Sequence, residues 1–401
     1  MQRDVILLFT ARSIRLFAYG ALSVVLALYL HEAGLTGAAI GLLFTMTLVG
    51  DAGITLWITT TADRVGRKRM LILGAGLMVM AGIVFSMTGN IVLLVIAGVI
   101  GVISPSGNEI GPFLSLEQAA LSQLLPSEQR TKAFAWYNLA GSLAAALGAL
   151  AGGLLSQSLE NAGFSALYSY RAVIVGYAAC GAALMVLFLF LSPAVEAIAT
   201  APATERILGL HRSRGVVIKL SALFALDAFA GGFVIQSMVA YWFHVKFGLD
   251  AGVLGGIFFG ANILAGISAL LAVRLAGRIG LINTMVYTHI PSNVLLCLVP
   301  FMPTAGLAVF VLLLRFSISQ MDVPTRQSYT MAVVAPDERS AASGVTTIAR
   351  SIGAAASPAL AGILLATPAL ISAPFLIAGC LKIGYDLLLY RSFSKADIHL
   401  S

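Results

Sequence analysis

The sequence has few charged residues: Asp, Glu, Lys and Arg together make up 10% of its 401 positions, whereas hydrophobic residues make up 59%. Its mean hydropathy is +0.96. A soluble protein needs a polar shell around its core, and this composition does not supply one. The scarcity of charge therefore excludes an ordinary soluble protein and indicates that lipid surrounds most of the surface.

The sequence is also poor in cysteine, and its three cysteines stand far apart, at Cys180, Cys297 and Cys380. This spacing excludes a disulfide framework and a clustered metal site, so we interpret the three as small core residues. The chain also lacks a nucleotide-binding loop and a nucleophilic triad. We therefore expect that the protein is not an enzyme or an ATP-driven pump, and that it uses no metal and no cofactor.

Long apolar segments fill the chain. A helix needs roughly 20 apolar residues to cross a bilayer, and we predict an all-α integral membrane protein with 12 transmembrane helices. Their approximate spans are 5–31, 38–61, 70–88, 91–125, 131–157, 170–192, 218–245, 251–276, 281–302, 305–334, 341–366 and 372–392. We expect the third, sixth, ninth and twelfth to be almost free of charge and to face lipid. The first, second, fourth, seventh and tenth carry ionisable groups and are expected to face an interior.

The net charge of +7 is explained by the positions of the basic residues, without a nucleic-acid partner. Lys and Arg gather in alternate loops and in the middle of the chain, and the loops between are nearly free of them. The residues concerned are Arg64, Arg67, Lys68, Arg69, Arg130, Lys132, Arg206, Arg212, Arg214, Lys219, Arg274 and Arg278. Because positive loops stay on the cytoplasmic side, we expect both termini in the cytoplasm and a multi-pass protein of a bacterial-type inner membrane.

The two halves of the chain resemble each other. Matching pairs are Gly34 with Gly248, Gly41 with Gly255, Gln118 with Gln327 and Arg130 with Arg339. Two halves in the same order, each with an even number of crossings, give parallel repeats related by a pseudo-twofold axis along the membrane normal, with substrate bound between them. We predict two six-helix bundles, 1–192 and 218–401, joined by a polar cytoplasmic linker, 193–217.

The loop after the second predicted helix carries a motif, in which Asp63 and Arg64 precede Gly66 and the basic Arg67 follows it. This stretch resembles the loop signature of the major facilitator superfamily of secondary transporters, although Thr59 stands at the family's first glycine. Asp63 is suited to accept hydrogen bonds from the N-terminal amides of a neighbouring helix, and the basic residues to hold the membrane boundary. We predict that these four motif residues form a conformational clasp; the alternative is a basic loop that only sets topology.

The fifth predicted helix carries small residues at regular spacing, including Gly148, Gly152 and Gly153, and the eleventh repeats the pattern around Gly353 and Pro358. The pattern is similar to a signature of the family's proton-coupled exporters, and this resemblance favours export. Close packing of two helices through small residues is an equally good explanation. The family resemblance implies a central cavity that opens alternately to each side, in many members coupled to proton flow.

One carboxylate, Asp51, stands about halfway along the second predicted helix, where an unpaired charge would cost several kcal/mol. Arg15, slightly below the middle of the first helix, makes an Arg15–Asp51 ion pair possible. We interpret Asp51, Arg15 and Glu109 as proton-coupling residues, because movement of a carboxyl between a desolvated site and an arginine would load and unload a proton. A purely structural ion pair is the alternative.

The fourth predicted helix is too long for one straight crossing, and its centre contains Pro105, Gly107, Gly111 and Pro112. We predict a break between positions 104 and 112. Interrupted backbone at membrane depth is tolerated only inside protein or along a wet cavity, so the break points to the substrate site. The cavity residues predicted from this segment are Asn108, Glu109, Glu117 and Gln118. A simple kink, with Glu109 bound by backbone amides, is the alternative.

Helices seven, eight and ten supply the rest of the predicted cavity. The residues concerned are Asp227, Gln236, Asn262, Arg315, Asp322 and Arg326. Arg326 aligns with Glu117 in the repeat, so opposite charges occupy equivalent places. We predict that Glu117 and Arg326 form a cytoplasmic-side lock that closes in one transport state; pairing of Arg326 with Asp322, one turn away, is the alternative.

These observations predict a secondary active transporter that moves a small solute by alternating access, with proton coupling and efflux as the direction. The alternatives are proton-coupled import of a nutrient or an anion and, from another class, a transporter-like membrane receptor or lipid-handling protein. Buried arginines would suit an anionic substrate and buried carboxylates a cation, and the sequence does not decide between them. As partners we expect a small-molecule substrate, protons and membrane lipids, with no nucleic acid, and we expect a monomer.

Overall fold

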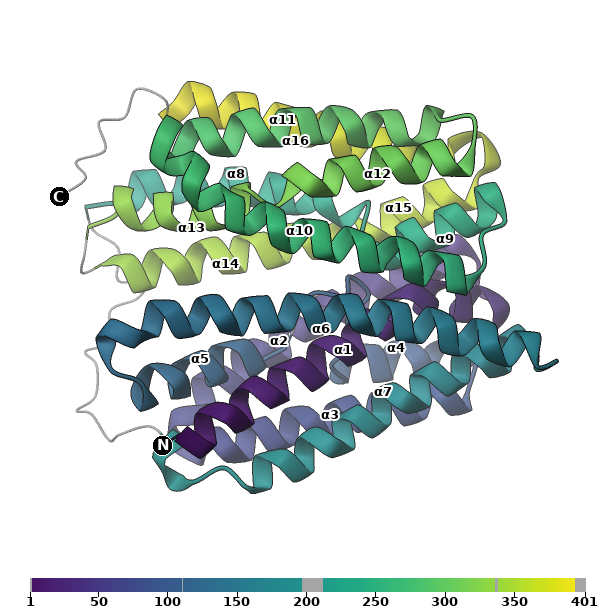
Figure 1. Cartoon of the computed structure of the whole chain (residues 1–401), viewed down its shortest axis with the longest axis horizontal. Coiled ribbons are helices and arrows are strands. Elements are labelled where there is room, and N and C mark those ends of the chain that lie inside the picture. Colours follow the sequence, from purple (N-terminus) through teal and green to yellow (C-terminus); the bar gives the residue numbers. More distant parts are fainter. Residues whose placement is uncertain (1, 110, 197–211, 336–337, 394–401) are drawn as a thin grey trace. The chain divides into compact units, whose positions relative to one another are not determined.

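The computed structural model describes all of the chain except residues 1, 110, 197–211, 336–337 and 394–401 and the side chains at positions 63, 127, 128, 131 and 340. The regular structure of the described residues is helical throughout (Figure 1). Before the linker the helices are α1 (Gln2–Glu32), α2 (Gly37–Val65), α3 (Arg67–Met87), α4 (Ile91–Ile100), α5 (Phe113–Leu124), α6 (Ser127–Asn161) and α7 (Ala166–Leu189), followed by the 3-10 turn η1 (Pro193–Val195).

The second half begins with α8 close to the predicted end of the linker. Its helices are α8 (Arg214–Gly232), α9 (Gln236–Phe247), α10 (Ala251–Ile279), α11 (Leu281–Leu298), α12 (Ala305–Ser319), α13 (Asp322–Val333), α14 (Arg339–Ala356), α15 (Pro358–Ala366) and α16 (Ala373–Phe393). Short 3-10 turns, η2 (Val299–Phe301) and η4 (Pro368–Leu370), end α11 and precede α16.

Eleven helical segments of the described chain are long and apolar enough to cross a membrane, and they correspond to eleven of the predicted spans. Three of them are formed by consecutive shorter helices: α8 with α9, α12 with α13, and α14 with α15. The remaining predicted span, 91–125, is occupied by the short helices α4 and α5 with irregular backbone between them. The fold is that of an all-helical, multi-pass membrane protein.

The chain packs into two compact units. Unit 1 comprises residues 1–200 and 235–262, and unit 2 comprises 201–234 and 263–401. In unit 1, α1 is the central helix and packs against α6, α7 and α9, while α3 packs along α7. In unit 2, α8 packs against α14 and α16, and α11 against α12, α13 and α16. The predicted bundle boundaries at the linker stay a prediction, and most of that linker lies outside the described residues.

Glycines allow α1 and α6 to lie in direct backbone contact. A Cβ on Gly148 would stand 1.9 Å from the carbonyl oxygen of Phe17, and a Cβ on Gly20 would stand 2.1 Å from that of Ala145. In unit 2, Gly353 of α14 meets the backbone of Ala225 on α8 in the same way. The small residues of the fifth and eleventh predicted helices therefore allow close packing of two helices, which was one of the two explanations of the pattern.

Candidate functional site

The predicted break in the fourth helix is confirmed. Helix α4 ends at Ile100, α5 begins at Phe113, and the backbone between them turns through Gly107 and Gly111, whose φ values are 69° and 80°. Only glycine adopts such angles without strain. The carbonyl of Pro105 accepts a hydrogen bond from the backbone N–H of Ser237 at 3.0 Å. Neighbouring helices thus satisfy backbone groups that the break leaves open, as irregular backbone at membrane depth requires.

Two carboxylates near this break bind Arg15, which lies fully buried in the middle of α1. Its Nε donates to Glu109 at 2.7 Å, and its two terminal nitrogens donate to the two oxygens of Glu117, each at 2.7 Å. The Glu117 carboxylate is also fully buried and accepts a hydrogen bond from the Tyr137 hydroxyl of α6. A guanidinium held on both edges in this way is a rigid, fully engaged cation.

A second arginine of α1 completes the ionic cluster of unit 1, which consists of Arg12, Arg15, Glu109 and Glu117. Arg12 donates to Glu109 at 2.9 Å and to Asn138 of α6 at 3.2 Å. Its guanidinium occupies the space that a side chain at Gly141 would fill. Glu109, on the broken segment, is therefore held by two arginines one turn apart on α1.

The structure does not contain the Arg15–Asp51 ion pair that the sequence made possible, because Glu109 and Glu117 take up the donors of Arg15 among the described residues. Asp51 lies beside the backbone amide of Gly111 and close enough to Glu109 for electrostatic interaction. Its Oδ1 is buried without a hydrogen-bond partner among the described residues. Asp51 thus lies beside the broken segment, next to Glu109. Arg12 and Arg15 form ion pairs with Glu109 and not with Asp51.

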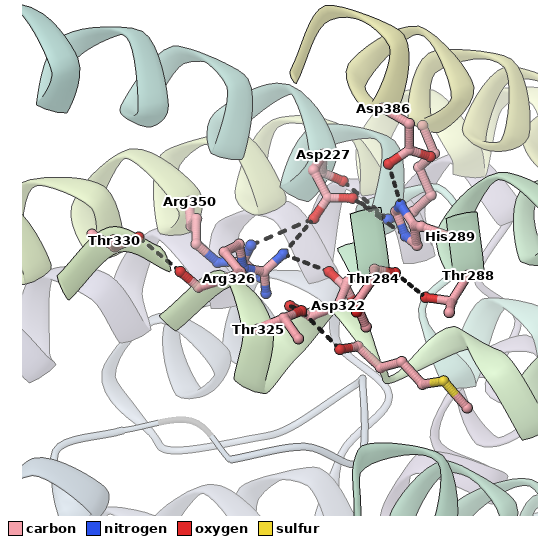
Figure 2. A network of polar contacts seen from close by, with 12 residues as sticks. Asp227, Thr284, Thr288, His289, Asp322, Thr325, Arg326, Thr330, Arg350 and Asp386 are labelled. Atoms are coloured by element: carbon pink, nitrogen blue, oxygen red, sulfur yellow. Dashed lines mark hydrogen bonds and ion pairs between the residues drawn. The ribbon is translucent and has the colours of Figure 1, made fainter. Parts of the chain in front are cut away.

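Unit 2 contains a larger ionic cluster centred on Asp227 of α8 (Figure 2). This carboxylate binds Lys382 of α16 at 2.5 Å, Arg326 of α13 at 3.1 Å and Arg350 of α14 at 3.4 Å. Arg326 also binds Asp322 at 2.9 Å, one turn before it on α13. The pairing of Arg326 with Asp322, which was the alternative to a lock with Glu117, is therefore present.

A histidine extends the cluster of unit 2 towards α16. The Nδ1 of His289, on α11, is 2.8 Å from Asp386, and its Nε2 is 4.0 Å from Asp227 (Figure 2). The other oxygen of Asp386 accepts a hydrogen bond from Asn293 at 3.2 Å. His289 thus lies between two buried carboxylates from different helices.

Sequence reasoning missed four members of this cluster: His289, Arg350, Lys382 and Asp386. The expectation that the twelfth predicted helix is almost free of charge is wrong, because it carries Lys382 and Asp386, both buried in unit 2. The signal was available in the sequence, since two opposite charges four residues apart in an apolar helix lie on one face and must be satisfied inside the protein.

The clusters of the two units use equivalent positions with opposite charge. Helices α5 and α13 begin at Phe113 and Asp322, which are equivalent in the repeat, and Glu117 and Arg326 each stand one turn later. Glu117 binds an arginine of α1, whereas Arg326 binds a carboxylate of α8. Each has its partner inside its own unit, and the Glu117–Arg326 lock stays a prediction.

The remaining predicted cavity residues make fewer contacts. Gln236 donates to the hydroxyl of Ser23 on α1 at 2.7 Å. Asn108 is exposed on the broken segment, and Gln118 and Asn262 are half-buried. Arg315 of α12 is half-buried and has no ion pair among the described residues, and its Nε has no hydrogen-bond partner there.

The predicted clasp lies where α2 passes into α3. Gly66 ends α2 with a φ of 112°, and the backbone N–H of Arg67 donates to the Glu196 carboxylate at 2.6 Å. Arg64 is exposed, and the side chain of Asp63 lies outside the described residues. Glu196, which follows α7, therefore accepts hydrogen bonds from the amides at the N-terminus of α3. The motif suggested this role for an aspartate.

Comparisons with known proteins agree with this architecture. The model of the Major Facilitator Superfamily matches residues 8–358. The uncharacterized membrane protein YJR124C of Saccharomyces cerevisiae is 31% identical over 426 residues, covering 98% of this chain and 95% of that protein. The quinolone resistance protein NorA of Staphylococcus aureus is 25% identical over 157 residues, 39% of each chain.

Among solved structures, a variant of the nucleoside transporter NupG superposes with a TM-score of 0.77 at 13% identity, covering 97% of this chain and 99% of that one. A D-xylose-proton symporter superposes with a TM-score of 0.73 at 14% identity, covering 96% and 97%. These two likenesses concern the fold alone. With the family match over most of its length, the chain belongs to the major facilitator superfamily.

Proposed function

We propose that the protein is a proton-coupled secondary transporter that moves a small solute by alternating access. In this proposal twelve transmembrane helices form two six-helix bundles, 1–192 and 218–401, related by a pseudo-twofold axis along the membrane normal. Both termini face the cytoplasm, following the distribution of Lys and Arg, and the protein works as a monomer in a bacterial-type inner membrane.

The observation that carries the proposal is the arrangement of Asp51 and Glu109 at the broken segment. Glu109 is held by Arg12 and Arg15 at 2.9 and 2.7 Å, whereas Asp51, its neighbour, has a buried oxygen without a partner among the described residues. A buried carboxyl without a cation favours its protonated form, and an approaching guanidinium favours the ionised form. A shift of the broken segment against α1 would therefore transfer a proton on or off this pair of carboxyl groups.

Efflux is the direction that we propose, in exchange for protons. The local similarity to the quinolone resistance protein NorA supports this direction, as does the small-residue pattern of α6. A proton-coupled importer is the second candidate, and the fold similarity to the D-xylose-proton symporter supports it. The two differ in the sign of the flux that an imposed pH gradient drives, and transport by protein of known orientation distinguishes them.

The test is transport by the purified protein in liposomes with an imposed pH gradient, using a metabolite and drug panel. Asp51→Asn should abolish uphill transport and leave counterflow exchange largely intact, since an amide resembles a protonated carboxyl in shape but cannot release the proton. Asp250→Asn is the matched control, because Asp250 is exposed and caps the start of α10, a role that asparagine also fills.

Uphill transport that survives in Asp51→Asn would assign Asp51 a structural role and overturn the proton-coupling proposal. Absence of proton-linked flux for every compound in the panel, with folded wild-type protein, would instead favour a transporter-like receptor or a lipid-handling protein.

A further inference from the structure

Among the described residues, the charges of the cluster around Asp227 do not balance. Its cluster contains the carboxylates of Asp227, Asp322 and Asp386. The permanent cations around them are Lys382, Arg326, Arg350 and Arg315, all with electrostatic or direct contact to these carboxylates. Four permanent cations therefore face three carboxylates, before any charge on His289 is counted. Inside a low-dielectric protein such an excess of positive charge attracts an anion.

Two of these cations are poorly engaged. The one ion pair of Arg350 within the described part of the chain is with Asp227, at 3.4 Å, and that carboxylate already binds Lys382 at 2.5 Å and Arg326 at 3.1 Å. The Arg350 side chain keeps 35% of its surface exposed. Arg315 interacts with Asp227 and Asp322 only at longer range, and its Nε has no partner among the described residues. Both guanidinium groups thus have donors to offer around the same pair of carboxylates.

A third free donor stands next to Arg315. Ser319 lies one turn later on α12, on the same helix face, and its hydroxyl is buried without a hydrogen-bond partner in the described chain. Helix α12 ends at this residue, before α13 restarts at Asp322. A guanidinium with a buried Nε and a buried hydroxyl one turn apart form a donor set of the kind that binds a carboxylate or a phosphate.

Arg12 and Arg15 of unit 1 differ because both make close ion pairs, although the Nε of Arg12 also has no hydrogen-bond partner among the described residues. Arg12 and Arg15 have carboxylate oxygens at 2.9 and 2.7 Å, and Arg15 uses three of its nitrogens in this way. Their charge is already compensated by residues of the protein. An anionic ligand would gain little there and would have to displace Glu109 or Glu117, whereas at Arg315 and Arg350 it would compensate charge that the protein leaves uncompensated.

We propose that unit 2 carries a binding site for the anionic group of an organic solute, formed by Arg315 and Ser319 of α12 and Arg350 of α14. The ligand class is a carboxylate or phosphate, which the planar guanidinium fork binds with two parallel hydrogen bonds. The proposal rests on the proposed transport function in one respect, because a transporter would carry the anion bound here as its solute. Binding itself requires neither a proton gradient nor transport.

The test is thermal unfolding of the full chain in uncharged phosphatidylcholine nanodiscs, with benzoate or inorganic phosphate as the probe. Benzamide is the neutral match for benzoate, and sodium chloride controls for ionic strength. We expect benzoate, phosphate or both to raise the melting temperature, while benzamide and chloride do not. Arg315→Gln should weaken the apparent affinity for the stabilising anion about tenfold or more, and Arg315→Lys should retain part of it.

Arg274→Gln is the matched control, because Arg274 is an exposed arginine of α10 in the same unit. Arg350→Gln removes the more exposed cation and serves as the second variant should Arg315→Gln fail to fold. Equal stabilisation by benzamide, or anion binding unchanged in both glutamine variants, would overturn the proposal. Stabilisation by phosphatidylglycerol alone, with no effect of the soluble anions, would overturn it in favour of a lipid headgroup.

These outcomes are independent of the proposed function. Anion binding that depends on Arg315 would stand even if the liposome experiment showed no proton-linked flux. Proton-driven transport of a neutral or cationic solute, with no anion binding, would remove this site and leave the transport proposal intact.

Discussion

The ion pair between Arg15 and Glu117 offers a test of how unit 1 is stabilised. Both side chains have no exposed surface, and two hydrogen bonds of 2.7 Å join them. Arg15→Met removes the cation and leaves the Glu117 carboxylate buried, with the Tyr137 hydroxyl as its one remaining donor among the described residues. Breaking a buried pair from one side costs about 3–5 kcal/mol, so we expect a loss of that size in the free energy of unfolding.

The double variant Arg15→Met, Glu117→Met should be more stable than the single one. Glu109 keeps Arg12 at 2.9 Å, so no buried charge is left without a partner. The remaining cost is chiefly the unpartnered Tyr137 hydroxyl and imperfect packing, about 1–2 kcal/mol. The double variant should therefore be more stable than Arg15→Met by about 2–3 kcal/mol. The coupling energy of the cycle is this difference plus the cost of Glu117→Met alone, well above the error of additivity for distant sites.

The assay is SDS-induced unfolding in mixed micelles, followed by fluorescence, on wild type, both single variants and the double variant. Arg69→Met is the control, because Arg69 is an exposed arginine of α3 and its loss should change stability by less than about 0.5 kcal/mol. Additive effects of the two substitutions would refute the reasoning, since they would mean that Arg15 and Glu117 do not compensate each other's charge.

Two further predictions concern helix contacts. Gly148→Ala should lower the free energy of unfolding by about 1–3 kcal/mol in the SDS-unfolding assay, because the new Cβ would meet the Phe17 carbonyl of α1. Gly215→Ala is the control and should be neutral in the same assay, because a Cβ there meets no atom within 4 Å. Glu338→Gln should cost about 0.5–2 kcal/mol in thermal or SDS unfolding, because the Glu338 carboxylate accepts bonds of 2.8 Å from the backbone amides of Arg212 and Ser213 at the start of α8. An unchanged stability in Glu338→Gln would show that the negative charge adds nothing at this helix start, because the glutamine oxygen can still accept a hydrogen bond.

The helices and the break of span four followed from the sequence because they depend on local chemistry. A run of apolar residues has to cross the membrane as a helix, and prolines with glycines interrupt it wherever they cluster. The pairing of Arg326 with Asp322 is local in the same sense, because the two residues stand one turn apart on α13. Such features need no knowledge of how distant helices pack.

The composition of the two clusters could not be predicted in the same way. The sequence offers carboxylates in more than one predicted helix as partners for Arg15. Only the packing of α1 against α5 and the broken segment brings Glu109 and Glu117, rather than Asp51, to its guanidinium. Arg12 reaches Glu109 because Gly141 on α6 leaves room for it. A glycine on one helix that makes space for an arginine on another leaves no pattern within either segment.

We expect the two clusters, which have opposite polarity, to perform different tasks. An ion pair has the same attraction whichever helix carries the cation, so either polarity serves to hold α5 against α1 or α13 against α8. Proton chemistry lacks this symmetry, because arginine stays charged while a carboxyl group releases its proton. In unit 1 the break supplies a carboxylate, Glu109, with Asp51 beside it, and in our proposal both change charge when the broken segment moves. In unit 2 the equivalent span, α12 with α13, supplies permanent cations, Arg315 and Arg326, which in our proposal keep their charge and attract an anion instead. We therefore expect unit 1 to bind and release the proton and unit 2 to bind the anionic solute. The repeat then preserves the positions of the ion pairs but exchanges which helix carries the cation and which carries the carboxylate.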